Sequence, residues 1–152
     1  MAHDLVKLVE NMYAATMSGD FEKFAEFLHP DFYVHESDAL PFSGRFEGIE
    51  GFLKIFEIVF GIYDDAGVEQ KVICAGPDHA MVLLDFNARN KTTGEAFTTP
   101  MIEMFRFVGD KLIEIKPFYF DPSLLHKMLP DDVAGSNWFY AFVIFSKLAD
   151  SL

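Results

Sequence analysis

The stretch "EAFTTPMIEMFRFVGDKLIEIKPFYF", residues 95–120, contains two runs of strand-forming residues separated by the short turn sequence "VGD". Turns of this length join antiparallel neighbours, so the stretch predicts a β-hairpin. In the first run, Met101, Phe105 and Phe107 alternate with Ile102 and Met104, so both faces of the strand are apolar. A strand that is apolar on both faces is usually covered on both.

Two further strand-like runs, "VEQKVICAG" and "HAMVLLDFNAR", precede the hairpin, and "GPD" and "NKTTGE" separate the runs, so a four-strand meander is predicted. Helical periodicity dominates the front of the chain, from Leu5 to Thr16, after Asp20 and over about 49–63, with a short strand at 32–36. Asp121 and Pro122 end the sheet, and helices are predicted at 123–129 and about 137–151. The pattern predicts an α+β fold with helices on one face of an antiparallel sheet.

The helices cover one face of this sheet, and the other apolar face needs a partner. A second copy of the chain is the simplest partner, so we expect a homodimer that forms through the outer face of the sheet.

The composition limits the classes of function. The 152 residues fit one domain, 1–152, and a hydrophobic content of 51% with 18 Phe allows a core with a lined cavity. A net charge of −12 disfavours binding to nucleic acid and to anionic membranes. The single Cys74 excludes an internal disulfide, and the scattered histidines give no metal-ligand spacing. We expect no metal, no cofactor and no signal peptide, and a cytoplasmic location.

Two glutamates, Glu36 and Glu103, lie where their strand neighbours are bulky and apolar. Glu36 shares its strand face with Phe32 and Val34. Glu103 shares its strand face with Met101, Phe105 and Phe107. Burial disfavours an ionised carboxyl and raises its pKa, which makes a general base near neutral pH or an acid that donates a hydrogen bond. The alternative is that each lies in water at the sheet rim or pairs with a cation.

Lys116 shares a face of the last strand with Phe118 and Phe120. If this face lines the cavity, Lys116 is a buried cation near the two acids. It then neutralises one of them, orients a substrate anion or acts as an amine, and a structural ion pair is favoured over an amine nucleophile. Tyr119 and Asp121 end the same strand, where a cavity mouth is expected, and Asp121 also suits the cap of the next turn.

The front helices, the segment "HPDFYVHESDALPFSGRFEGIEGFLKIF" and the closing "IEMFRFVGDKLIEIKPFYFD" resemble SnoaL-like polyketide cyclases and ketosteroid isomerase-like proteins of the nuclear transport factor 2-like superfamily. The resemblance covers residues 5–121, with 122–152 as a helical extension outside it. It implies a strongly curved, cone-shaped antiparallel sheet with the N-terminal helices over its concave face. It also implies a homodimer and cofactor-free proton transfer on a small carbonyl compound.

The resemblance also implies site residues. Glu36 falls at the general base of the isomerases, Glu103 at their protonated acid, and Asp121 at the acid/base of the cyclases. The isomerases' tyrosine of the first helix falls on Met12, one step from Tyr13. The expected catalytic set is Glu36, Glu103, Lys116 and Asp121, and the expected lining is Met12, Tyr13, Phe42, Phe46, Phe56, Phe105, Phe118 and Phe120.

Three functions fit the sequence. The first is an isomerase or cyclase for a small hydrophobic carbonyl compound, with Glu36 as base; the presence of Lys116 favours an anionic or enolic ligand over a sterol. The second is a binding or dimerisation module in which Glu36, Glu103 and Lys116 satisfy one another. The third is an interaction domain that uses "NWFYAFVIFSKL", which is apolar nearly all round; burial of this segment over the cavity or in a dimer is the simpler alternative.

Overall fold

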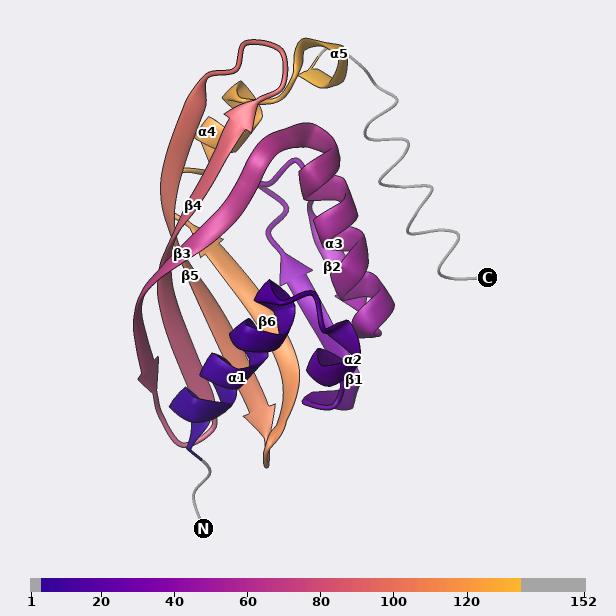
Figure 1. Cartoon of the computed structure of the whole chain (residues 1–152), viewed down its shortest axis with the longest axis vertical. Coiled ribbons are helices and arrows are strands. Elements are labelled where there is room, and N and C mark those ends of the chain that lie inside the picture. Colours follow the sequence, from indigo (N-terminus) through magenta and orange to yellow (C-terminus); the bar gives the residue numbers. More distant parts are fainter. Residues whose placement is uncertain (1–3, 135–152) are drawn as a thin grey trace.

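Six strands form one curved sheet in the order β2-β1-β6-β5-β4-β3 in the computed structural model, which describes residues 4–134 (Figure 1). The strands are β1 (Leu28–Glu36), β2 (Gly44–Glu47), β3 (Tyr63–Ala75), β4 (His79–Asn90), β5 (Ala96–Val108) and β6 (Lys111–Tyr119). The helices are α1 (Leu5–Met17), α2 (Phe21–Ala25), α3 (Gly48–Ile62), α4 (Pro122–Lys127) and α5 (Asp131–Ala134). The predicted α+β class, the meander β3–β6 and the curved sheet are confirmed.

The first strand makes the sheet mixed, which the sequence did not predict. β1 runs antiparallel to β2 but parallel to β6, with Val34 opposite Ile115. The strand begins at Leu28, four residues before the predicted strand at 32–36, and runs through Pro30. β2 was not predicted, because its four residues carry little strand signal.

The helices α1, α2 and α3 lie on one side of the sheet, which defines its inner face (Figure 1). α1 contacts β3 and β4, whereas α3 contacts β1, β2 and β3. Phe24 of α2 stacks on Phe52 of α3 with ring centroids 4.4 Å apart, and Phe32 of β1 meets both rings edge-on. This aromatic cluster joins α2 and α3 to the sheet and leaves space deeper between them.

The short helix α4 follows the sheet as predicted, and Asp121 caps it by accepting a hydrogen bond from the Leu124 backbone N–H at 3.2 Å. The buried Tyr63 hydroxyl donates to the Leu125 carbonyl at 2.6 Å, and Asn90 donates to two carbonyls beyond the helix. These bonds hold α4 against the sheet. The helix expected at 137–151 lies outside the described residues. Within the described part of the chain, no helix is long and apolar enough to cross a membrane.

Two glycines, Gly48 and Gly51, allow α3 to begin directly after β2 and to pack closely against it. Gly48 has φ +67°, a conformation that favours glycine, and it turns the chain from strand to helix. Gly51 lies one turn later against the backbone of Phe46, where an added Cβ would come within 2.5 Å of the Phe46 carbonyl carbon. The requirement at Gly51 is therefore space, not backbone freedom.

We predict that Gly51→Ala destabilises the protein by about 1–3 kcal/mol, because the new methyl group forces α3 away from β2. Gly61→Ala is the matched control, since Gly61 lies in the same helix and no described atom comes within 4 Å of an added Cβ. There alanine should be neutral or stabilise by about 0.5–1 kcal/mol through its helix propensity. Urea unfolding of both variants measures the difference, and equal stabilities would contradict the packing argument.

Candidate functional site

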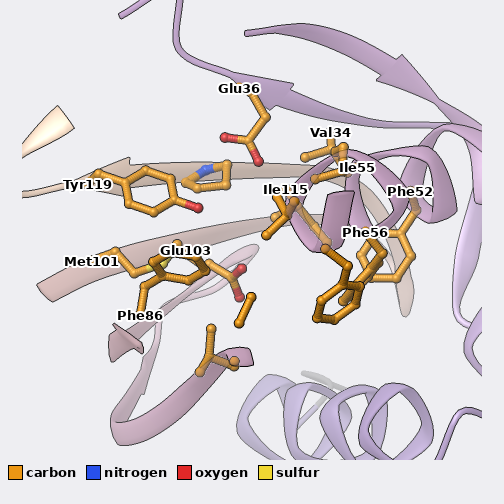
Figure 2. Close-up of a pocket in the computed structure, with 16 residues that line it drawn as sticks. Val34, Glu36, Phe52, Ile55, Phe56, Phe86, Met101, Glu103, Ile115 and Tyr119 are labelled. Atoms are coloured by element: carbon orange, nitrogen blue, oxygen red, sulfur yellow. The ribbon is translucent and has the colours of Figure 1, made fainter. Parts of the chain in front are cut away.

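A cavity of about 120 Å³ lies between the inner face of the sheet and α3. Figure 2 shows its wall, in which two carboxyl groups face an otherwise apolar space. Aromatic rings from α3 and the sheet make up much of the surface. The lining residues are Val34, Glu36, Phe52, Ile55, Phe56, Val59, Phe60, Ala66, Gly67, Val68, Phe86, Met101, Glu103, Ile115, Pro117 and Tyr119.

Glu36 is the last residue of β1 and points into this cavity (Figure 2). It is 3% exposed, and its Oε2 atom is buried and has no hydrogen-bond partner among residues 4–134. Burial, together with the charge of nearby Glu103, raises the pKa of Glu36 to about 8. The strand pattern predicted an inward-facing Glu36, and its side chain is buried there, with no ion pair to a cation in the part of the chain that is described.

Glu103 approaches the same space from the middle of β5 (Figure 2). Its Oε2 accepts a hydrogen bond from the Tyr13 hydroxyl of α1. Burial raises the pKa of Glu103, and the bond from Tyr13 offsets only part of this rise. The pKa of Tyr13 is also raised, first by burial and then by the Glu103 charge, so the phenol keeps its proton and acts as the donor.

Tyr13 therefore takes the inward position that the resemblance gave to Met12. A smaller cavity of about 70 Å³ adjoins the first, and Met12, Tyr13 and Phe105 line it together with Glu103. Met12 is 1% exposed and contributes wall but no polar group. α1 is rotated so that Tyr13, one residue after Met12, reaches Glu103 on β5.

Tyr119 supplies a further hydroxyl at the cavity. Figure 2 shows the oxygen of Tyr119 directed toward the space between Glu36 and Glu103. Burial, and then the charges of Glu36 and Glu103, raise the pKa of Tyr119 well above its usual value, so this phenol is also a donor. The sequence placed Tyr119 at a cavity mouth, and the structure places its ring within the wall.

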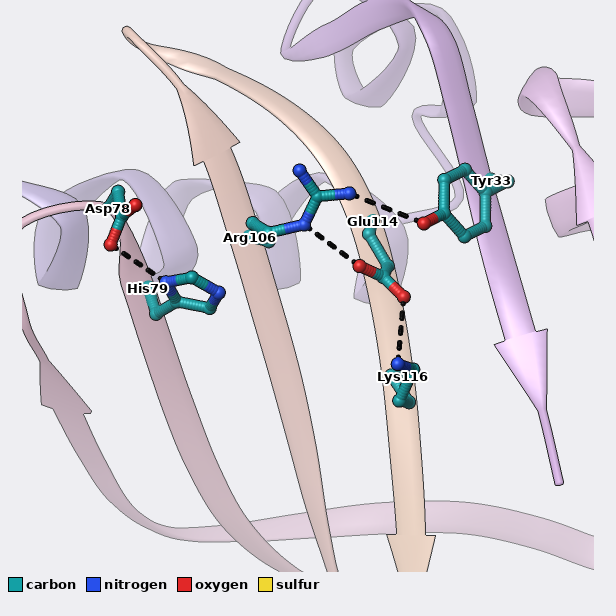
Figure 3. Close-up of polar contacts among 6 residues, drawn as sticks. All are labelled: Tyr33, Asp78, His79, Arg106, Glu114 and Lys116. Carbon is teal, nitrogen blue, oxygen red and sulfur yellow. Dashed lines mark hydrogen bonds and ion pairs between the residues drawn. The ribbon is translucent and has the colours of Figure 1, made fainter.

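Lys116 does not lie in the cavity, contrary to the prediction. It lies on the outer face of the sheet, where its Nζ pairs with Glu114 Oε1 at 3.2 Å (Figure 3). Arg106 binds the other oxygen of Glu114 at 2.9 Å and donates to the Tyr33 hydroxyl at 3.3 Å. Although burial alone raises the pKa of Glu114, the bonds from Arg106 and Lys116 bring it below its usual value.

A β-bulge explains this reversal. Arg106 pairs with Glu114, but the next residue, Phe107, pairs with Leu112, so Ile113 is an extra residue on β6. Leu112, before the bulge, is fully buried. Beyond the bulge, the odd-numbered residues of β6 face inward in place of the even-numbered ones. Ile115, Pro117 and Tyr119 then face the cavity, and the predicted wall residues Phe118 and Phe120 are 55% and 82% exposed.

The other predicted residues divide into two groups. Phe56 and Phe105 line the larger and the smaller cavity, as expected. Phe42 and Phe46 are buried but are among the lining residues of neither cavity, and the centroid of the Phe42 ring lies 6.0 Å from that of Tyr119. Asp121 serves the α4 cap, and hydrogen bonds, first from the Ser123 side chain, lower its pKa, so nothing places it at the cavity.

Several lining residues were missed by the sequence reasoning. Phe52 and Val59 belong to the apolar face of α3, and that periodicity identified core but not cavity. Met101 shares a strand face with Glu103 and was a usable signal. Phe86 had no distinguishing pattern. Within residues 4–134, no group of three or more His, Cys, Asp or Glu side chains is placed to hold a metal ion.

Solved structures with the same fold support this architecture. An NTF2-like protein from Burkholderia thailandensis E264 matches with a TM-score of 0.73 and 16% identity over 80% of this chain and 94% of that one. IdmH from Streptomyces antibioticus, for which a polyketide cyclase activity is proposed, matches with a TM-score of 0.67 and 18% identity, over 83% and 98%. A SnoaL-like protein from Jannaschia sp. CCS1, also proposed to be a polyketide cyclase, matches with a TM-score of 0.66 and 16% identity, over 86% of this chain and 92% of that one.

At these identities the structural matches establish the fold and no shared activity. Comparison with curated proteins gives no match. The sequence pattern of the SnoaL-like domain matches residues 9–115, which is most of the chain and includes Glu36, Glu103 and Tyr13. The chain therefore belongs to the SnoaL-like domain family.

Proposed function

We propose that this protein is a cofactor-free isomerase or cyclase that transfers a proton on a small hydrophobic carbonyl compound. The observation that carries the proposal is the buried carboxyl of Glu36, which points into an apolar cavity, has no described partner for Oε2 and has a pKa of about 8. A carboxyl of this pKa is far more basic than an ordinary glutamate and is partly ionised near neutral pH. The polyketide cyclase activities proposed for structures of the same fold agree with this chemistry.

In the proposed reaction, ionised Glu36 removes a proton from the carbon next to the carbonyl group. Negative charge then develops on the carbonyl oxygen, and preorganised donors stabilise it. Glu103 in its protonated form is one donor: Tyr13 occupies its Oε2, which leaves the other oxygen to carry a proton toward the ligand. The Tyr119 hydroxyl is the second donor.

The wall also restricts the substrate. Within residues 4–134 the lining includes no Lys, Arg or His, and Lys116 lies on the other face of the sheet. The reason for expecting an anionic or enolic ligand is thereby lost, since that expectation rested on a cation in the cavity. A volume of about 120 Å³ favours a compact ligand, because drug-sized sites measure about 300–1,000 Å³.

The direct test is deuterium exchange. Small cyclic ketones are incubated with the protein in D₂O, and loss of the α-proton signal is followed by NMR. We expect exchange well above the rate in buffer, with a rate that rises with pH to about 8 and then levels as Glu36 becomes fully ionised. Saturable ketone binding without exchange would contradict the enzyme proposal and favour a ligand-binding module.

We further propose that the protein is a homodimer through the outer face of the sheet. Four exposed apolar side chains form a continuous row across β3 to β6, because Val72 pairs with Leu83, Leu83 with Ile102, and Ile102 with Phe118. Each of the four is 40–55% exposed. An apolar row of this kind on one face is typical of an interface.

Ile102→Glu should convert the dimer to a monomer, because it places two buried charges near the centre of the interface. Light scattering after size exclusion measures the mass. Phe120→Glu is the control, since Phe120 is more exposed but lies outside the row, and it should remain dimeric. A monomeric wild-type protein at tens of micromolar, or a dimeric Ile102→Glu, would contradict this assignment.

A further inference from the structure

The carboxyl groups of the cavity wall have no cationic side chain beside them among residues 4–134. Glu36 and Glu103 are both part of the lining, and no cationic residue of the described chain lies among the lining residues. The nearby cations of the sheet, Arg106 and Lys116, are bound to Glu114 on the outer face. An ionised carboxylate in an apolar site is costly unless a positive charge accompanies it. Both carboxyls therefore tend to keep their protons near neutral pH, and ionisation of Glu36 creates a need for positive charge that residues 4–134 do not meet.

The form of the wall indicates which cation would meet this demand. The Oε2 atom of Glu36 is buried and directed into the space, and no residue of the described chain binds it. Aromatic rings lie on both sides of the carboxyl groups, Phe52 and Phe56 from α3 on one side and Phe86 and Tyr119 from the sheet on the other (Figure 2). Aromatic walls around a negative group are how proteins hold methylated ammonium ions.

We propose that this cavity binds a small methylated ammonium ion, whose charge is balanced by Glu36 and whose methyl groups contact the surrounding rings. The inference concerns the cavity of the proposed function but does not depend on proton transfer there. A neutral ketone contacts the apolar wall but does not stabilise ionised Glu36, whereas a metal or an inorganic ammonium ion balances that charge but does not contact the apolar wall favourably. The small volume excludes bulky cations.

Binding of such an ion is linked to the proton of Glu36. The titratable groups that face Glu36 are Glu103 on β5 and Tyr119 on β6, with Tyr13 of α1 behind Glu103, and the lining residues of α3 and β3 are uncharged. A cation stabilises ionised Glu36, whose pKa is about 8 in its absence. At pH 7 each ion bound should therefore release close to one proton. Affinity should rise roughly tenfold per pH unit up to about pH 8 and then level off.

The test compares choline with 3,3-dimethylbutan-1-ol, its neutral isostere, by isothermal titration calorimetry of the full chain. We expect choline to bind roughly tenfold or more tightly than the alcohol. Titrations in two buffers of different ionisation enthalpy measure the proton release. Glu36→Gln should lower the affinity for choline by roughly tenfold or more and change the affinity for the alcohol by no more than about twofold. Asp31→Asn is the matched control: it removes one carboxylate from the same strand, but from a side chain that is 84% exposed.

Equal affinities for choline and the alcohol would overturn the inference, as would the absence of proton release at pH 7. Equal weakening by Asp31→Asn and Glu36→Gln would also overturn it, because general attraction by the net charge of −12 would then explain the binding. Choline binding in a protein that exchanges no ketone protons would support this inference and contradict the proposed function, so the two failures are separable.

Discussion

Glu36→Gln should slow the exchange of ketone α-protons by about 10²–10⁴-fold relative to the wild-type protein, the usual contribution of a general base. The amide has nearly the same shape as the carboxyl but accepts no proton from the substrate. The cavity should therefore keep its form, and ketone binding should change little. Deuterium exchange at saturating ketone measures the loss in the chemical step, and NMR titration of the same ketone measures binding.

Glu103→Gln is the informative comparison for this result. The proposed role of Glu103 is to donate a hydrogen bond, and an amide still donates one, while its carbonyl oxygen still accepts from Tyr13. We expect a loss of about tenfold or less, well below that of Glu36→Gln. If the two substitutions slowed exchange equally, or if Glu103→Gln were the more damaging, the assignment of base and donor would be wrong.

The strand pattern was sufficient to locate both acids. Glu36 and Glu103 each stood among bulky apolar neighbours on one strand face, and an inward-facing strand carries its acid inward with them. Both were placed correctly because alternation is reliable over the few residues on either side. The same local reasoning predicted the hairpin β5–β6 and the meander, since each short turn joins neighbours in sequence.

The positions of the mispredicted residues depend on contacts between elements, which the sequence of a single strand does not reveal. One extra residue, Ile113, reverses the alternation of β6, so Lys116 and Phe118 move outward while Tyr119 moves inward. A bulge of this kind is set by pairing with the neighbouring strand, and no residue in "KLIEIKPFYF" indicates it. Similarly, the parallel pairing of β1 with β6 joins segments about eighty residues apart. The Tyr13–Glu103 contact depends on how α1 is rotated over the sheet.

Glu36→Gln should also make the protein more stable at alkaline pH while changing its stability less in acid. In the folded protein the pKa of Glu36 is about 8, raised by burial from its usual 4.5. Below pH 4.5 the carboxyl is protonated in both the folded and the unfolded chain, so its ionisation does not change the free energy of unfolding. From pH 4.5 to 8 the unfolded chain loses this proton and the folded protein keeps it, so stability falls as pH rises. The full loss above pH 8 is roughly 4–5 kcal/mol at most.

Glutamine does not titrate, so this loss is absent from the variant. The unfolding free energy of Glu36→Gln minus that of the wild-type protein should therefore increase steadily between about pH 5 and pH 8 and level above it. Urea unfolding across this range measures the difference. Glu103 gives both proteins a slope of the same sign, because its pKa is also raised, and the subtraction removes most of it. The exposed Asp31→Asn variant should follow the wild-type curve over the same range. Parallel curves for Glu36→Gln and the wild-type protein would mean that Glu36 titrates as an ordinary carboxyl, and the proposed base would then be lost together with the demand for a cation.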